Sequence, residues 1–258
     1  ESVPATQAGV DASADVVAAV DASTPSSPDD GSTSMGCANS TLDINDDFET
    51  FPGPWTVDQQ GGSATRTAQW ADLTSGPTGS FVLAGVSLAS SGDHIHPAAF
   101  YRALANRPVR EARLEYAFAA EALAPYTEGL CALGVRNANG NDEVRIYPSA
   151  SGAPVTLAIS ASRYFNADSS DVGTSFSIGA TQKHEWHQAA IVLRLSTPTS
   201  LDVRVILDGA VAGTMTTLTL PFVQDGLFVD CGVIFMKAPS GAASVVGIDN
   251  VRLRLCPR

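Results

Sequence analysis

Apolar and polar residues alternate one by one along many short segments of this chain, and this pattern restricts what it can fold into. Leu114, Tyr116 and Phe118 fall on one side of such a segment, with Arg113 and Glu115 on the opposite side, and the alternation recurs at 201–207 and 251–255. A period of two is that of a β-strand with one buried face. No stretch of useful length has the spacing of an amphipathic helix, so an all-β protein is predicted.

Turn signals separate the predicted strands. Asp208-Gly209 and Asn139-Gly140 each lie between two β-rich runs, as in a short hairpin. With further strands expected at 65–70, 80–88, 155–160, 187–195 and 226–236, the total is about a dozen. That pattern favours a two-sheet antiparallel sandwich over a barrel or propeller.

The chain of 258 residues is long enough for one all-β domain and a tail. Residues 1–36 contain six acidic residues, no Lys or Arg and no aromatic residue. Such a segment buries too little apolar surface to offset its ordering entropy, so we expect a disordered acidic Ala/Ser/Asp/Pro spacer. The alternative is a short strand or helix at 16–20. Residues 37–258 are the predicted sandwich domain.

The charge and hydropathy exclude two classes of partner. The net charge is −12 and no basic stripe is present, which argues against nucleic acid. No segment approaches the roughly 20 apolar residues of a membrane helix. The first residue is Glu1 rather than Met, so a signal peptide is expected to have been removed. We therefore predict a secreted protein, or one tethered by a lipid to the outer surface.

Four cysteines support this location. Cys37, Cys131, Cys231 and Cys256 have no Cys-x-x-Cys spacing, so two disulfides in an oxidising compartment are favoured over a metal cluster. Buried free thiols are the alternative. Of three pairings, we prefer Cys37 with Cys256, which would tie the ends of the sandwich, and Cys131 with Cys231, which would join two predicted strands.

The ends of the domain and its middle resemble one fold family. The segments 46–50 and 247–253 are similar to the first and last strands of bacterial extracellular jelly-roll domains, which lie side by side. The passage 184–193, followed by a strand and Asp208-Gly209, resembles concanavalin A-like lectin and glucanase (LamG-like) domains. The likeness extends over residues 46–255 and implies a jelly-roll sandwich.

The catalytic residues of related hydrolases are missing. Laminarinase-type glycosidases use Glu-x-Asp-x-x-Glu on one strand, and this motif is absent. Glu111 and Glu115 are four residues apart without the intervening Asp, and we interpret them as the solvent face of a strand. Gly85-Val86-Ser87 lacks the second glycine of a nucleophile elbow. No catalytic residue is assigned.

A structural calcium ion is the metal that the resemblance implies. In jelly-roll carbohydrate-binding modules, acids of the first strand and an Asp of the last strand commonly hold it. The matching positions are Asp47, Glu49 and Asp249, and carboxylate oxygens suit Ca²⁺. The alternative is that Asp47 and Asp249 make turn hydrogen bonds.

The histidines suggest a second metal hypothesis. They form two close pairs, His94 with His96 and His184 with His187, and four imidazoles could hold zinc or copper. Against this, His187 belongs to the Trp-His strand start of relatives without a metal there, and His96 precedes Pro97 in a predicted loop.

Aromatic faces are the usual platforms for sugars. Trp55 and Trp186 are expected in the core. Trp70, Tyr147 and Tyr164 are candidate exposed platforms for a ligand, with packing against neighbours as the alternative for each.

Together these patterns favour a non-catalytic extracellular binding module for a polysaccharide or a cell-surface protein. A divergent glycoside hydrolase or polysaccharide lyase on the same sandwich is one alternative. The other is a structural protein that self-associates through exposed edge strands or its N-terminal segment.

Overall fold

The computed structural model describes most of the chain beyond residue 38. The described residues are 39–70, 77, 79–104, 109–124, 127–138, 143–151, 155–165, 168–171, 176–181, 184–220 and 223–258. Within them, the side chains of 143, 148–151, 155–181 and 215–218 are not described. The predicted spacer and its boundary at residue 36 therefore lie outside the described residues.

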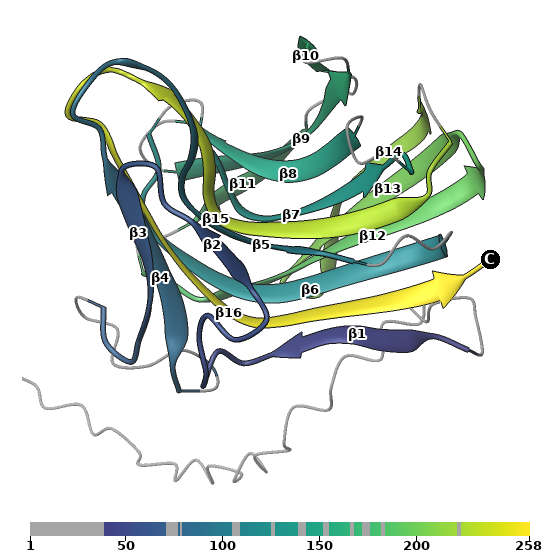
Figure 1. Ribbon diagram of the computed structural model, residues 1–258, viewed down its shortest axis with the longest axis horizontal. Coiled ribbons are helices and arrows are strands. Elements are labelled where there is room, and N and C mark those ends of the chain that lie inside the picture. The colour runs from purple at the N-terminus through teal and green to yellow at the C-terminus, as the bar shows by residue number, and fades with distance from the viewer. Residues whose placement is uncertain are drawn as a thin grey trace, which may run out of the picture. The chain divides into compact units, whose positions relative to one another are not determined.

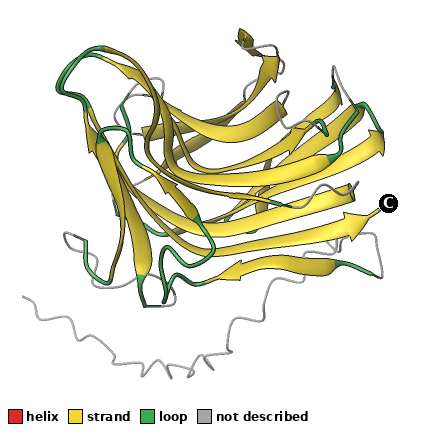
Figure 2. Ribbon diagram, in the orientation of Figure 1, coloured by secondary structure: helices red, strands yellow, loops and turns green. Residues whose placement is uncertain are grey.

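The described residues form strands joined by loops and turns, without a helix (Figure 2). Because they contain no helix at all, they contain none that could cross a membrane. Their sixteen strands form two antiparallel sheets, so the predicted two-sheet sandwich is confirmed. The sequence predicted fewer strands because several are interrupted by bulges or are very short.

Sheet A has eight strands, in the order β14-β13-β12-β6-β16-β4-β3, with β1 also pairing with β16 (Figure 1). Its strands are β1 (Thr41–Asp46), β3 (Gly62–Thr67), β4 (Phe81–Ser87), β6 (Val109–Ala122), β12 (His187–Thr197), β13 (Ser200–Leu207), β14 (Ala210–Thr219) and β16 (Ala243–Pro257).

Sheet B also has eight strands, in the order β10-β9-β8-β7-β15-β5-β2, with β11 also pairing with β9. Its strands are β2 (Thr56–Asp58), β5 (Gly92–Ala103), β7 (Thr127–Arg136), β8 (Glu143–Ser151), β9 (Val155–Phe165), β10 (Asp168–Asp171), β11 (Phe176–Thr181) and β15 (Gly226–Ala238).

The first and last strands lie side by side, as expected, but the first strand is β1 and only Asp46 of the matched segment 46–50 belongs to it, because residues 47–50 form the loop that follows. In the β1–β16 pair, Thr41 lies opposite Leu255 and Asp46 opposite Val251. The last strand is also central in its sheet, because β16 pairs with β4, β6 and β1. The chain thus closes sheet A by bringing its final strand back to its first.

Turn chemistry explains two local features. Asp208 and Gly209 have φ angles of 49° and 79° between β13 and β14, the positive values that a two-residue hairpin requires. Residues 139–142 lie outside the described residues, but the flanking β7 and β8 pair antiparallel. The strand predicted at 65–70 ends at Thr67 instead, because its hydroxyl accepts a hydrogen bond from Gln69 N at 3.2 Å and starts a turn.

The main core lies between the sheets. Leu114 and Ile248 of sheet A and Leu133 and Val229 of sheet B belong to one buried cluster, and their neighbours in sequence face outward because side chains alternate along a strand. Trp55 belongs to this cluster, as predicted.

One predicted disulfide is confirmed. Cys131 of β7 and Cys231 of β15 lie opposite each other and are bonded. Cys256 is also disulfide-bonded. Its predicted partner, Cys37, lies outside the described residues, so that pairing stays a prediction.

Candidate functional site

The outer face of sheet B carries the candidate site. On β15, Val229 and Cys231 point into the core, so Asp230 between them faces outward. Asp230 lies opposite Tyr101 of β5 and Ala132 of β7. The strands of sheet B are bowed, and the inside of the bend is this outer face (Figure 1).

Four charged side chains from four strands meet there, and we call them the Asp230 network: Asp58 of β2, His96 of β5, Arg145 of β8 and Asp230. Oδ2 of Asp230 lies 3.2 Å from His96 Nε2 and 3.2 Å from Arg145 Nη1. The other imidazole nitrogen, Nδ1, lies 3.1 Å from Asp58 Oδ2. Strands far apart in the sequence therefore bring two acids and two bases into one chain of contacts.

Burial makes this network costly unless it is paired. Asp230 is only 1% exposed, and an unpaired carboxylate in such a place would lose several kcal/mol of hydration. The hydrogen bond that the His96 imidazole donates to Asp230 is the main cause that raises the pKa of His96, against the opposing effect of burial. The second oxygen of Asp230, Oδ1, is buried and has no hydrogen-bond partner among the described residues. A buried acceptor of this kind calls for a functional explanation.

Aromatic rings border the network. Tyr101 stacks on His96 with 6.3 Å between ring centroids. On the other side, the guanidinium carbon of Arg145 lies 5.2 Å from the centroid of the Phe228 ring. That ring covers Gly134, where a Cβ atom would come within 1.9 Å of Phe228 Cζ. Of these two rings, that of Phe228 is buried and that of Tyr101 is half-buried.

Tyr147, one of the three predicted platforms, belongs to this face. It packs with Ala132 and Ile234 in a small cluster on the outer side of sheet B. It is 4% exposed, so its position agrees with the packing alternative and its ring is not an open platform. The side chain of Tyr164 lies outside the described residues.

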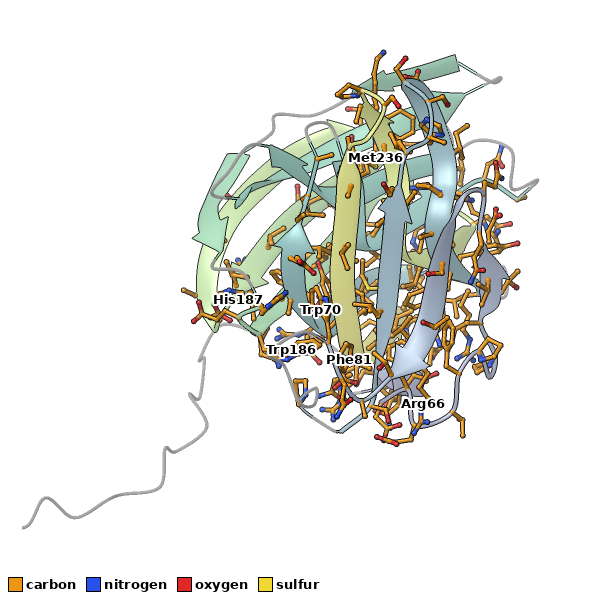
Figure 3. The ribbon with its side chains drawn as sticks, turned by 90° about the vertical axis from the view of Figure 1, so that its left-hand side faces the viewer. Arg66, Trp70, Phe81, Trp186, His187 and Met236 are labelled. Carbon is orange, nitrogen blue, oxygen red and sulfur yellow. A yellow bond between two sulfur atoms is a disulfide. The ribbon has the colours of Figure 1, made fainter. Side chains whose placement is uncertain are left out.

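Trp70 lies instead on the outer face of sheet A, and Figure 3 shows it close to Phe81 and Trp186. It is 6% exposed, and its Nε1 donates to Glu121 Oε2 at 3.1 Å. A Cβ atom at Gly247 would lie 3.1–3.3 Å from all three rings, so this glycine makes room for them. Trp186, expected in the main core, therefore packs in a separate cluster on the other side of the sheet.

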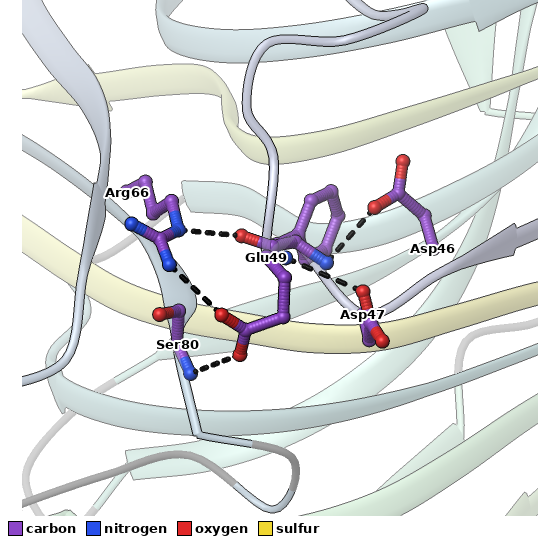
Figure 4. Close-up of polar contacts among 6 residues, drawn as sticks. Asp46, Asp47, Glu49, Arg66 and Ser80 are labelled. Atoms are coloured by element: carbon purple, nitrogen blue, oxygen red, sulfur yellow. Dashed lines mark hydrogen bonds and ion pairs between the residues drawn. The ribbon is translucent and has the colours of Figure 1, made fainter.

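Asp47 and Glu49, two of the predicted calcium ligands, follow β1 in a loop (Figure 4). Asp47 Oδ1 accepts a hydrogen bond from Glu49 N at 3.3 Å. The carboxylate of Glu49 accepts one from Arg66 Nη2 at 2.8 Å and one from Ser80 N at 2.9 Å. The Ser80 bond is the main cause that lowers the pKa of Glu49. Both residues thus make hydrogen bonds within the protein.

Asp249, the third predicted calcium ligand, is fully buried in β16 and accepts a hydrogen bond from Asn250 N at 2.7 Å. In the part of the chain that the structure describes, no three His, Cys, Asp or Glu side chains are grouped to hold a metal ion. Calcium at Asp47, Glu49 and Asp249 therefore stays a prediction from the resemblance.

The four histidines are not brought together. Each contacts a different group: His94 lies 3.2 Å from Ser90 O, His96 contacts Asp58 and Asp230, His184 lies 3.5 Å from Glu121, and His187 lies 2.8 Å from Asp208. The described histidines therefore give no support to a shared zinc or copper site.

The sequence did not single out Asp58, Arg145 or Asp230. For Asp230 a signal existed, since it is the one charged residue in the apolar run 227–236, and a charge within a buried strand is unusual. Asp58 and Arg145 stand in ordinary alternating segments, where a charged residue signals only an outward face.

The sequence matches no protein family and no curated protein. Its structure is similar to those of carbohydrate-related proteins. The endo-β-1,4-glucuronan lyase of the fungus Trichoderma reesei has a TM-score of 0.62 at 12% identity, covering 83% of this chain and 95% of the lyase. A carbohydrate esterase of the Shiga toxin-encoding bacteriophage phi24B has 0.53 at 18% identity, covering 84% and 100%.

The cellulose-induced protein Cip1 has a TM-score of 0.53 at 13% identity, covering 81% of this chain and 96% of Cip1. At such identities the likeness concerns the fold alone.

Proposed function

We propose that this protein binds a polysaccharide across the outer face of sheet B, around Asp230. The observation that carries the proposal is the Asp230 network itself: two acids and two bases held together on the outer side of a sheet. Buried ion pairs seldom improve on apolar packing, so their presence on an outward face suggests a functional role. The half-buried ring of Tyr101 beside His96 supplies an apolar face on which a sugar can stack.

The fold supports the same reading. The sandwich is shared with a lyase, an esterase and a cellulose-induced protein, and the sequence resembles concanavalin A-like lectins. We extend to this chain only the general class of ligand, because fold alone does not determine activity.

Affinity electrophoresis of the full chain tests the proposal. Gels would contain either a neutral β-glucan or a uronate polymer, and retarded migration reports binding. Tyr101→Ala removes the ring that stacks on His96, and we expect it to weaken retardation roughly tenfold, as loss of one aromatic contact in a site can do.

Trp70→Phe is the matched control. It changes the other described platform residue, which lies on the outer face of sheet A, and should leave retardation unchanged. Equal effects of the two substitutions, or no retardation by either polymer, would count against a site on sheet B.

A lyase is the second candidate function, and one observation favours it. Arg145 and His96 both contact Asp230 on the outer face, and the half-buried Tyr101 stacks on His96. In β-elimination from a uronate, a base removes the proton at C5, the C4–O bond breaks and a C4=C5 double bond forms, while the departing oxygen gains a proton. The cations Arg145 and His96 would stabilise the charge that builds on the uronate carboxylate. Tyr101 would transfer the proton from C5 to the departing oxygen.

The unsaturated product absorbs ultraviolet light, so its appearance during incubation with glucuronan or alginate tests this candidate. Binding without any rise in absorbance would leave the binding-module proposal in place and remove the lyase.

The remaining proposals concern location and calcium. Disulfide-bonded Cys131, Cys231 and Cys256 support secretion or exposure on the outer surface. A cell-surface protein as partner and self-association stay predictions from the sequence.

Calcium near Asp249 is retained on the resemblance alone. If the ion stabilises the terminal strands, chelation with EDTA lowers the Tm, and an unchanged Tm removes the ion from the proposal.

A further inference from the structure

Strand β2 is attached weakly at the edge of sheet B. It has three residues and, among the strands that the structure describes, pairs only with β5. Beyond that ladder, Gln60 N donates to His96 O at 3.1 Å, and Asp58 contacts the imidazole of His96. His96 itself has a φ of 46°, an uncommon left-handed value for a residue with a side chain. The backbone and the side chain of one histidine thus both hold this edge.

The protonation state of His96 decides whether both of its side-chain contacts can exist. Nδ1 faces Asp58 and Nε2 faces Asp230. An ionised carboxylate only accepts hydrogen bonds, and a neutral imidazole has a single N–H. Both contacts are therefore satisfied only by the imidazolium, which donates from both nitrogens. Loss of the proton leaves one nitrogen lone pair facing a carboxylate.

The two acids differ in how well they tolerate that loss. The Asp230 side chain is 2% exposed and that of Asp58 is 33% exposed. Water can replace the hydrogen bond at Asp58, whereas Asp230 is buried and would suffer the larger penalty. The single N–H of the neutral imidazole therefore remains hydrogen-bonded to Asp230, and the hydrogen bond to Asp58 is lost.

We propose that His96 is a protonation-dependent latch that holds strand β2, and the turn that follows it, against strand β15. Asp58, on β2, and Asp230, on β15, are its two anchors. Arg145, reaching in from β8, is the other charge near it, and Tyr101 of β5 stacks on its ring. Arg145 disfavours the imidazolium, but the two carboxylates outweigh it, in agreement with the raised pKa of His96.

The sign of the pH dependence follows from this direction. A histidine whose pKa is higher in the folded protein stabilises the fold fully below its ordinary value of 6.5, and this contribution is lost as the pH rises through the raised value. Strand β2 is accordingly held at acidic pH and released at alkaline pH.

Two measurements on the full chain test the latch without any ligand. NMR titration of the imidazole gives the pKa of His96, and amide hydrogen exchange, corrected for intrinsic rates, gives the protection of residues 56–60. We expect protection there to fall roughly tenfold as His96 loses its proton, as for loss of one charge-assisted hydrogen bond. The amides of β15 should show no such step.

Asp58→Asn is the decisive variant. Its side-chain NH₂ can donate to a neutral imidazole nitrogen, so the step in protection should disappear while near-ultraviolet circular dichroism reports an intact fold. His94→Gln is the matched control, since His94 lies two residues from His96 and its ring contacts Ser90 O at 3.2 Å rather than Asp58 or Asp230. It should keep the step.

Persistence of the step in Asp58→Asn, or flat protection at 56–60 across the titration of His96, would overturn the latch. Because the readout involves no carbohydrate, the latch and the proposed function can fail separately. If both hold, affinity for the polysaccharide also falls over the same pH range.

Discussion

Replacing Asp230 by Asn removes the one carboxylate that both His96 and Arg145 contact. The two bases stay in place, with side chains 21% and 10% exposed, and lose the buried carboxylate that they share. Removing one partner of a buried ion pair costs about 3–5 kcal/mol of unfolding free energy. Asn keeps the shape and one acceptor oxygen, so we expect the lower end, about 3 kcal/mol. For a domain of this size that is a fall in Tm of roughly 6–12 °C.

Urea unfolding followed by tryptophan fluorescence measures this cost, with the disulfides kept oxidised. A double-mutant cycle with Arg145→Met shows whether the cost arises from the ion pair. We expect Asp230→Asn and Arg145→Met each to be strongly destabilising. The double variant should lose clearly less unfolding free energy than the sum of the two single losses. A loss below about 1 kcal/mol for Asp230→Asn, or strict additivity, would refute the role of Asp230 as shared counter-charge.

Three further results are expected. Substituting Cys131→Ala and Cys231→Ala together opens a bridge with a sequence separation of 100, for which chain entropy gives about 4.7 kcal/mol; denaturation of the double variant measures it, and a change below about 1 kcal/mol contradicts it. Gly134→Ala forces the ring of Phe228 to move and should cost about 1–3 kcal/mol, whereas an unchanged Tm means that the ring shifts freely. Glu49→Gln should lower the Tm at neutral pH. Because the pKa of Glu49 is lowered from its ordinary value of 4.5, ionised Glu49 stabilises the fold above pH 4.5 and this stabilisation is lost at lower pH. A difference in Tm between the two proteins that persists in acid would contradict this.

The fold could be predicted because its signals are local or lie at the ends of the chain. Alternation at Leu114, Tyr116 and Phe118 reflects burial of one face of β6, and the hairpin at Asp208-Gly209 depends on two residues only. The pairing of β1 with β16 came from the likeness of both ends to known first and last strands. Strand ends were less predictable, since a single hydroxyl at Thr67 stops β3.

The candidate site could not be assembled in the same way. Asp58, His96, Arg145 and Asp230 have no common spacing, and they meet only because β2, β5, β15, β7 and β8 are neighbours in sheet B. That order depends on packing of whole sheets rather than on short motifs. The burial of Trp70 and Tyr147 was not predictable for a related reason: both stand in outward-facing positions, but neighbouring side chains pack against them.

The positions of β15 and β16 have a consequence for how this protein acquires its structure. These two strands lie within residues 226–257, in the middle of the two sheets. Strand β15 lies between β7 and β5, and β16 pairs with β6 on one side and with β4 and β1 on the other. On the ribosome, neither layer has its central member until that stretch has been synthesised. Until then each sheet consists of strand groups that are not joined, such as β6 with β12–β14 and β3 with β4 in sheet A, and the long-range pairing that joins them is slow. We expect that a nascent chain stopped before residue 226 would have neither a closed core nor the Asp230 network.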